Sequence, residues 1–168
     1  MKKNSIIISA NFIFYKNNLV PNIAIEVNHT GKIINILNNY PKNKTIFYNG
    51  IITPAFVNCH SHLELAYLKN KIKPHNSLNN FILSLTKIRN TNTYSIKSIT
   101  KHAYFADKLM FNNGINLVAD TNNSDITINI KKKSKIKYIN FIELFAFNPN
   151  DAKTTMNKGI ELHKNFIK

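Results

Sequence analysis

Two histidines separated by one serine, His60 and His62, are the residues of this chain best suited to chemistry. They follow an apolar run, residues 51–58, that is typical of a strand buried on both faces. Side chains i and i+2 of a strand point to the same side, so both imidazoles can converge on one metal ion. Neutral imidazole nitrogens suit zinc, iron or nickel. A chance pair at this spacing has a probability of about 0.2, so the pair alone is evenly balanced against a polar turn.

Three carboxylates also lie near predicted strand ends. Glu64 follows the histidines by two residues, and a substrate-facing position and a solvated loop position are equally compatible with it. Asp120 and Glu143 end two further predicted strands. Their carboxylates either line a pocket or accept hydrogen bonds at the start of the next segment as a helix cap, and we favour the second interpretation. We interpret the remaining histidines as structural: His29, His75, His102 and His163. We assign no catalytic residue.

The elements around these residues alternate between strands and helices. Hydrophobic periodicity predicts strands over residues 115–119 and 137–142 and helices over 77–89 and 95–112. A short helix is expected to start at Ser124 or Asp125, and a last helix to run from Asn150 or Asp151 towards Lys168. This alternation predicts an α/β fold of parallel βα units, three in number, across residues 50–168. Before these units, residues 1–49 are predicted to form a small antiparallel, β-sandwich-like segment. Its predicted strands cover residues 6–14, 20–27 and 32–37.

The composition is strongly basic, with a formal net charge of +15. Lysine supplies nearly all of this charge, since Arg89 is the single arginine. Recognition of nucleic acid usually recruits arginine, so we favour an AT-rich coding bias over nucleic-acid binding. The single cysteine, Cys59, cannot form an internal disulfide, and no apolar stretch is long enough to cross a bilayer. We therefore expect a cytoplasmic protein that does not enter a membrane.

Residues 50–64, with the sequence GIITPAFVNCHSHLE, resemble the first metal-binding motif of the amidohydrolase superfamily. That motif is a glycine and a strand ending in Pro-Gly-Phe-(Val/Ile)-(Asn/Asp), then His-x-His and often Leu-Glu. Ala55 departs from it, because the family usually has glycine there. Residues 111–120 and 138–147 are similar to the family's second and third barrel strands. Leu63-Glu64-Leu65 places the likeness nearest to the cytosine deaminase, guanine deaminase and chlorohydrolase-like branch.

The resemblance implies the N-terminal portion of a TIM-like (β/α)8 barrel and a metal-dependent hydrolase that acts on C–N bonds other than peptide bonds. It implies metal ligation by His60 and His62, zinc being favoured over iron or nickel, and a small-molecule substrate contacted by Glu64. The family's other ligands follow later strands, and no residue here matches them. We therefore expect a truncated chain with little or no activity of its own, whose site a complementary C-terminal chain would complete.

Two alternatives stay open. The lysines predict a module that binds RNA or another polyanion, in which the histidines are incidental. A non-functional remnant is the other alternative. The amidohydrolase interpretation is favoured because it accounts for the strand, the histidine pair and the order of the elements together.

Overall fold

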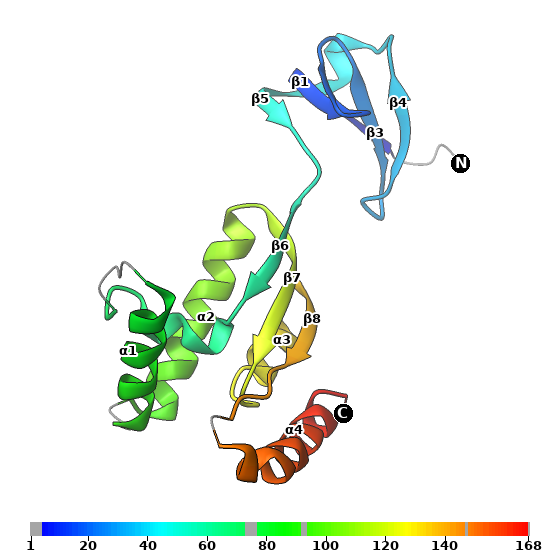
Figure 1. The fold of residues 1–168 in the computed structure, drawn as a ribbon. Coiled ribbons are helices and arrows are strands. Elements are labelled where there is room, and N and C mark those ends of the chain that lie inside the picture. The colour runs from blue at the N-terminus through cyan, green and yellow to red at the C-terminus, as the bar shows by residue number, and fades with distance from the viewer. Residues whose placement is uncertain (1–4, 73–76, 92–93, 147, 168) are drawn as a thin grey trace. The chain divides into compact units, whose positions relative to one another are not determined.

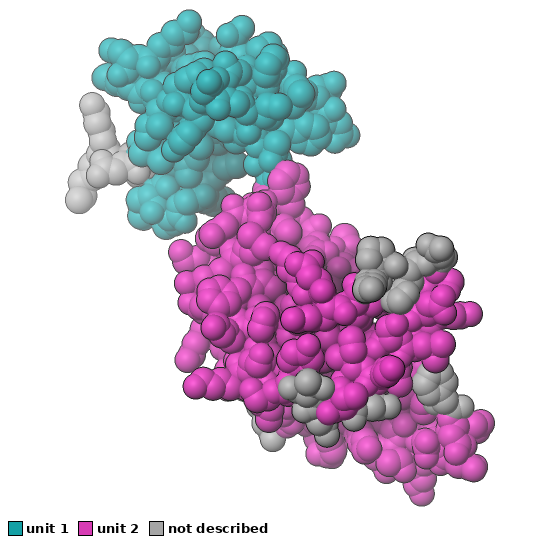
Figure 2. Space-filling view, turned by 90° about the vertical axis from the view of Figure 1, so that its left-hand side faces the viewer, with its two compact units in different colours: residues 1–54 teal, residues 55–168 magenta. Residues whose placement is uncertain are grey.

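The computed structural model describes residues 5–72, 77–91, 94–146 and 148–167. The chain divides into two compact units, residues 1–54 and residues 55–168 (Figure 2). The change of character that the sequence indicates at Gly50 lies inside the last strand of the first unit. His75 lies outside the described residues.

The first unit is one sheet of five strands. Four strands pair antiparallel in the order β2-β1-β3-β4, and β5 pairs with β1 in the parallel sense. The antiparallel prediction is therefore confirmed for β1 to β4, whereas the parallel strand β5 was not predicted in this segment. A cluster of isoleucines forms the core: Ile13, Ile23 and Ile25. The elements are β1 (Ser5–Tyr15), β2 (Asn18–Val20), β3 (Ala24–Asn28), β4 (Ile33–Leu37), the 3-10 turn η1 (Lys42–Lys44) and β5 (Thr45–Ile52).

The turns of this unit follow from single residues. Asn28 closes the turn between β3 and β4, because its Oδ1 accepts hydrogen bonds from the backbone N–H groups of Thr30 and Lys32. Gly31 has a φ of +81° there, which glycine adopts without steric cost. The predicted strand over residues 20–27 is divided into β2 and β3, because Pro21 has no N–H for a ladder and Asn22 has a φ of +58°.

The described residues of the second unit form a parallel sheet of three strands in the order β6-β7-β8, and helices connect each strand to the next along the chain (Figure 1). The predicted alternation of parallel βα units is confirmed. The predicted run over residues 51–58 is divided between β5 and β6, with Pro54 in the break. The elements are β6 (Phe56–Ser61), η2 (Leu63–Leu68), α1 (Leu78–Asn90), α2 (Ile96–Asn112), β7 (Ile115–Asn122), α3 (Ile128–Lys133), β8 (Lys137–Ile142), η3 (Pro149–Asp151) and α4 (Ala152–Ile167).

Local signals fix most helix ends. Ser77 and Ser95 cap α1 and α2 by accepting hydrogen bonds from the N–H groups of Asn80 and Ser98. Gly114, with a φ of +83°, follows α2 as predicted. The predicted start of the short helix is wrong: α3 begins at Ile128, after Thr127. Ser124 is instead bonded to Glu64, as described below.

The two faces of the parallel sheet differ in burial. Val118, Asp120 and Asn122 are buried on the face packed against α2 and α3, here called the covered face. The opposite face, here called the open face, carries Ile139 and Phe141, which are 52% and 54% exposed. The described residues of this unit form a three-stranded sheet and no closed barrel. Within the same described ranges, no helix has the length and apolar character needed to cross a membrane.

Candidate metal centre

The two histidines lie together at the carboxyl end of β6. Ser61 pairs in register with Asp120, so Ser61 lies on the covered face. A register shift between Asn58 and Ser61 leaves His60 exposed on the opposite, open face, and the ring of His62, directly after the strand, lies beside that of His60. Their ring centroids are 5.0 Å apart, and the ring planes meet at 81°. The structure thus places the two imidazoles next to each other, and their ligation of one metal ion stays a prediction.

The distance between the two ring centroids matches that of two imidazoles bound to one divalent ion. Two imidazoles that share a tetrahedral ion through bonds of about 2.0–2.1 Å have ring centroids about 5 Å apart. Nδ1 of His62 is buried and has no hydrogen-bond partner among the described residues. Such an atom indicates a missing ligand or proton acceptor. The described part of the chain contains no group of three His, Cys, Asp or Glu side chains able to hold a metal.

Glu64 lies beyond the histidines but is not solvated. Its side chain is buried, and the residue is 5% exposed. Oε1 accepts a hydrogen bond from the N–H of Asn123 at 3.2 Å, and Oε2 accepts two from Ser124, from the N–H at 3.0 Å and Oγ at 2.6 Å. Both carboxylate oxygens thus bind the segment after β7. Contact between Glu64 and a substrate stays a prediction.

Asp120 makes the reciprocal connection from β7 to β6. Its Oδ1 accepts a hydrogen bond from the N–H of Leu63 at 2.8 Å, and the side chain is fully buried. The hydrogen-bonding role favoured for Asp120 is confirmed. The carboxylates of Glu64 and Asp120, with the backbone groups of Leu63, Asn123 and Ser124, form what we call the interloop network. It fixes the backbone next to His62 on its C-terminal side.

Lys131 pairs its positive charge with the Asp120 carboxylate of this network. Its ammonium lies 2.5 Å from Asp120 Oδ2 and donates to the side-chain oxygens of Asn122 at 2.6 Å and Asn140 at 2.7 Å. Its side chain is only 6% exposed. Burial lowers the pKa of Lys131, while the hydrogen bond and the charge of Asp120 oppose that shift. Lys131 is not among the residues predicted from the sequence, because it begins a run of three lysines, a pattern typical of a solvated surface.

The other candidates are dispersed. His29 lies in the turn between β3 and β4, and His163 lies within α4. Nδ1 of His102 is 2.8 Å from the carbonyl oxygen of Ser98, one turn earlier in α2. Glu143 is exposed, and its backbone rather than its carboxylate contacts the end of β7. His60 and His62 are therefore the histidines that the described structure brings together.

Comparison with solved structures identifies this fold. The chain is similar to aminofutalosine deaminase of Helicobacter pylori in complex with methylthio-coformycin, with 21% identity over 95% of this chain and a TM-score of 0.71. It is also similar to atrazine chlorohydrolase of Arthrobacter aurescens TC1 complexed with zinc, with 15% identity over 88% of this chain and a TM-score of 0.68. An adenosine deaminase of Xanthomonas campestris with bound zinc matches 80% of this chain at 14% identity and a TM-score of 0.56.

These structures are deaminases and hydrolases of the amidohydrolase superfamily, and the likeness shows that this chain shares part of their fold. The chain covers 40%, 37% and 33% of their respective lengths. No protein-family model and no curated protein sequence matches the chain. The predicted α/β class is thus confirmed, and the activity stays a proposal.

Proposed function

We propose that this chain provides His60 and His62 as metal ligands of an amidohydrolase-type enzyme that hydrolyses C–N bonds other than peptide bonds, in the manner of a deaminase. The observation that carries the proposal is the convergence of both imidazoles on the open face, at the carboxyl end of a parallel strand. Barrels of this type place their chemistry at the carboxyl ends of the strands.

Zinc is the ion that best suits two imidazoles, and two of the similar structures contain it. A divalent ion held by His60 and His62 would supply hydroxide near neutral pH, the nucleophile that hydrolysis of an amidine-like or amide carbon requires. The chain's own contribution is to hold His60 and His62 in place through the interloop network beside them. Glu64 belongs to that network, so a contact with the small-molecule substrate is a secondary role for it.

The rest of the ligand set is proposed to come from further βα units, such as a complementary C-terminal chain would carry. Catalytic zinc usually has three protein ligands, and the described residues offer two in one place. Parallel sheets are normally covered on both faces, yet large apolar side chains are exposed on the open face. These are Val57, Ile139 and Phe141. A partner with parallel strands and inward-facing histidines would cover them and complete the metal site.

Metal binding tests the proposal directly. Purified chain is titrated with Co²⁺, whose visible absorption reports imidazole ligation, and the titration is repeated with His60→Ala plus His62→Ala. The matched control is His29→Ala plus His163→Ala, which removes the same number of imidazoles elsewhere. We expect one weakly bound ion in the parent and the control, and loss of the absorption band in the His60 and His62 double variant.

Turnover is then measured as ammonia release from amino-substituted heteroaromatic compounds, with and without a polypeptide carrying the remaining βα units of an amidohydrolase barrel. We expect release only in the combined sample. Turnover with stoichiometric metal by the chain alone would refute the two-ligand argument. Failure to bind metal even in the combined sample would overturn the proposed function.

A further inference from the structure

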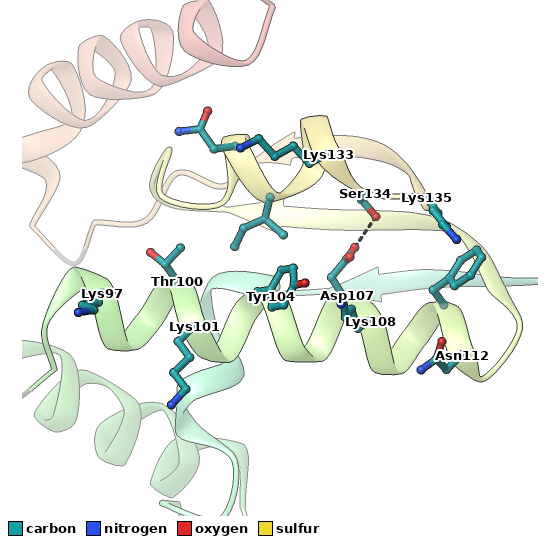
Figure 3. A pocket seen from close by; sticks show the side chains of 13 residues that line it. Lys97, Thr100, Lys101, Tyr104, Asp107, Lys108, Asn112, Lys133, Ser134 and Lys135 are labelled. Carbon is teal, nitrogen blue, oxygen red and sulfur yellow. Dashed lines mark hydrogen bonds between the residues drawn. The ribbon is translucent and has the colours of Figure 1, made fainter.

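A cleft of about 960 Å³ lies between α2 and α3 of the second unit (Figure 3). None of the residues that line it belongs to the histidine pair or to the interloop network. Its volume falls within the range of about 300–1,000 Å³ typical of small-molecule sites. The cleft is thus a candidate ligand site, separate from the proposed metal centre.

The rim of the cleft is strongly positive. Five lysines line it, three from α2 and two from the end of α3 and the residues after it: Lys97, Lys101, Lys108, Lys133 and Lys135. Within the described ranges, none of the five lies in an ion pair. The carboxylate among the lining residues, Asp107, is 6% exposed and accepts hydrogen bonds from Ser134 Oγ at 2.5 Å and Tyr138 OH at 2.7 Å. The cleft therefore carries an excess of positive charge that favours an anionic ligand.

The floor of the cleft is apolar and partly aromatic. Ile130 is buried there, whereas Tyr104 and Phe111 are 44% and 38% exposed, so their rings are accessible. The Lys108 ammonium lies 4.7 Å from the centroid of the Tyr104 ring, and that of Lys135 lies 5.2 Å from the Phe111 ring. Each of these ammonium groups thus lies over one face of a ring in a cation–π contact, while part of each ring stays exposed.

Polar groups complete the walls. Thr100, Asn112 and Asn129 line the cleft with a hydroxyl and two amides. Amides both donate and accept hydrogen bonds, so they match the polar edge of a heteroaromatic ring. Lysine heads provide point charges for phosphate oxygens. Flat rings, amides and lysines together select a ligand that has a planar polar ring and a phosphate.

We propose that the cleft between α2 and α3 binds a nucleotide, with its base against Tyr104 or Phe111 and its phosphates among the rim lysines. Stacking of a base on an aromatic side chain tolerates different bases. The same groups would also attract a single RNA strand, but a volume of about 960 Å³ is typical of a small-molecule site, so we favour one nucleotide.

The test measures ADP binding to the full chain by equilibrium dialysis, with adenosine and a single-stranded RNA oligomer as comparison ligands. One variant combines Lys101→Gln with Lys133→Gln. Its matched control combines Lys153→Gln with Lys158→Gln in α4, which removes the same charge from exposed positions. A third variant, Tyr104→Leu, removes the stacking surface. Thermal unfolding of each variant tests whether the substitution leaves the fold intact. Tyr104→Phe, which keeps the ring, is the control for an effect of Tyr104→Leu on folding.

We expect ADP to bind, the Lys101 and Lys133 variant to weaken binding about tenfold or more, and the α4 control to change it less than about twofold. Adenosine should bind more weakly than ADP, and Tyr104→Leu should weaken both ligands while Tyr104→Phe does not. Equal losses in the two double-lysine variants would overturn the proposal, because they would reveal diffuse attraction to a basic surface. Binding of the RNA oligomer without binding of ADP would overturn it in favour of a polymer ligand.

Discussion

The covered and open faces of the β6-β7-β8 sheet differ in how their polar side chains are buried and bonded. On the covered face, Asp120, Asn122 and Lys131 are buried and bonded to one another. On the open face, His60 is exposed and His62 keeps a buried ring nitrogen without a partner in the described structure. Buried charge on the covered face is satisfied by internal partners, whereas on the open face Nδ1 of His62 lacks such a partner among the described residues.

The difference in burial recurs between neighbouring residues at the end of β6. Ser61 lies on the covered face beside Asp120, and the histidines on either side of it lie on the open face. The interloop network then bonds Leu63 and Glu64, directly after His62, to β7 and the segment that follows it. Substitutions on the covered face should therefore change the free energy of unfolding, and substitutions on the open face should change ligand binding.

The largest expected effect is that of Lys131→Met. It leaves the Asp120 carboxylate buried without its cation, which typically costs about 3–5 kcal/mol of unfolding free energy. Urea unfolding followed by circular dichroism measures it, with Lys132→Met as the exposed control for the same loss of charge. Adding Asp120→Asn to Lys131→Met should restore part of the stability, because the buried charge is gone while Leu63 keeps its acceptor. A double variant no more stable than Lys131→Met would contradict the ion-pair argument.

The next effect is that of Glu64→Gln. One carboxylate oxygen becomes an NH₂ group, which faces the N–H of Asn123 or the N–H and hydroxyl of Ser124 as a second donor. We expect a loss of about 2 kcal/mol in the same unfolding measurement. Glu161→Gln is the control, since Glu161 forms an exposed ion pair with Lys164 on α4 and should cost less than about 1 kcal/mol. Equal losses would show that Glu64 does not stabilise the junction of the two segments.

A smaller, pH-dependent effect is expected at Tyr138. Burial raises the pKa of Tyr138, and the hydrogen bond and charge of Asp107 raise it further. Above about pH 10 the unfolded tyrosine loses its proton while the folded one keeps it, so this residue's contribution to stability falls as the pH rises. Tyr138→Phe should cost about 1 kcal/mol at pH 7, and the difference from the parent should shrink above pH 10. Urea unfolding at several pH values measures it; a constant difference would contradict the shift.

The sequence predicts what short-range signals determine. The strand over residues 137–142 is found with the predicted limits, and Ser77 and Ser95 cap their helices, because periodicity and capping are encoded within a few residues. The histidine pair was found for the same reason. Parallel pairing of β5 with β1 was not predictable from the strand pattern, because it depends on contacts between distant segments.

The burial of Glu64 and the role of Lys131 were not predictable for a common physical reason. Charged side chains are usually solvated, and each of these two is buried by partners in other segments of the chain. The bonds from Glu64 reach residues 59 and 60 positions later, and those from Lys131 reach two strands. Only the packing of α3 on the sheet shows that Lys131 faces inward while Lys132 and Lys133 are exposed.

The smallest expected change in stability is that of His60→Ala combined with His62→Ala. His60 is exposed, His62 is half-buried and neither ring supports the core clusters, so we expect a change within about 0.5 kcal/mol in urea unfolding. Removal of the unpartnered Nδ1 of His62 offsets part of the lost contact. A loss above about 2 kcal/mol would instead place the histidines among the structural residues. A near-neutral result together with loss of the Co²⁺ band would separate ligation on the open face from stability on the covered face.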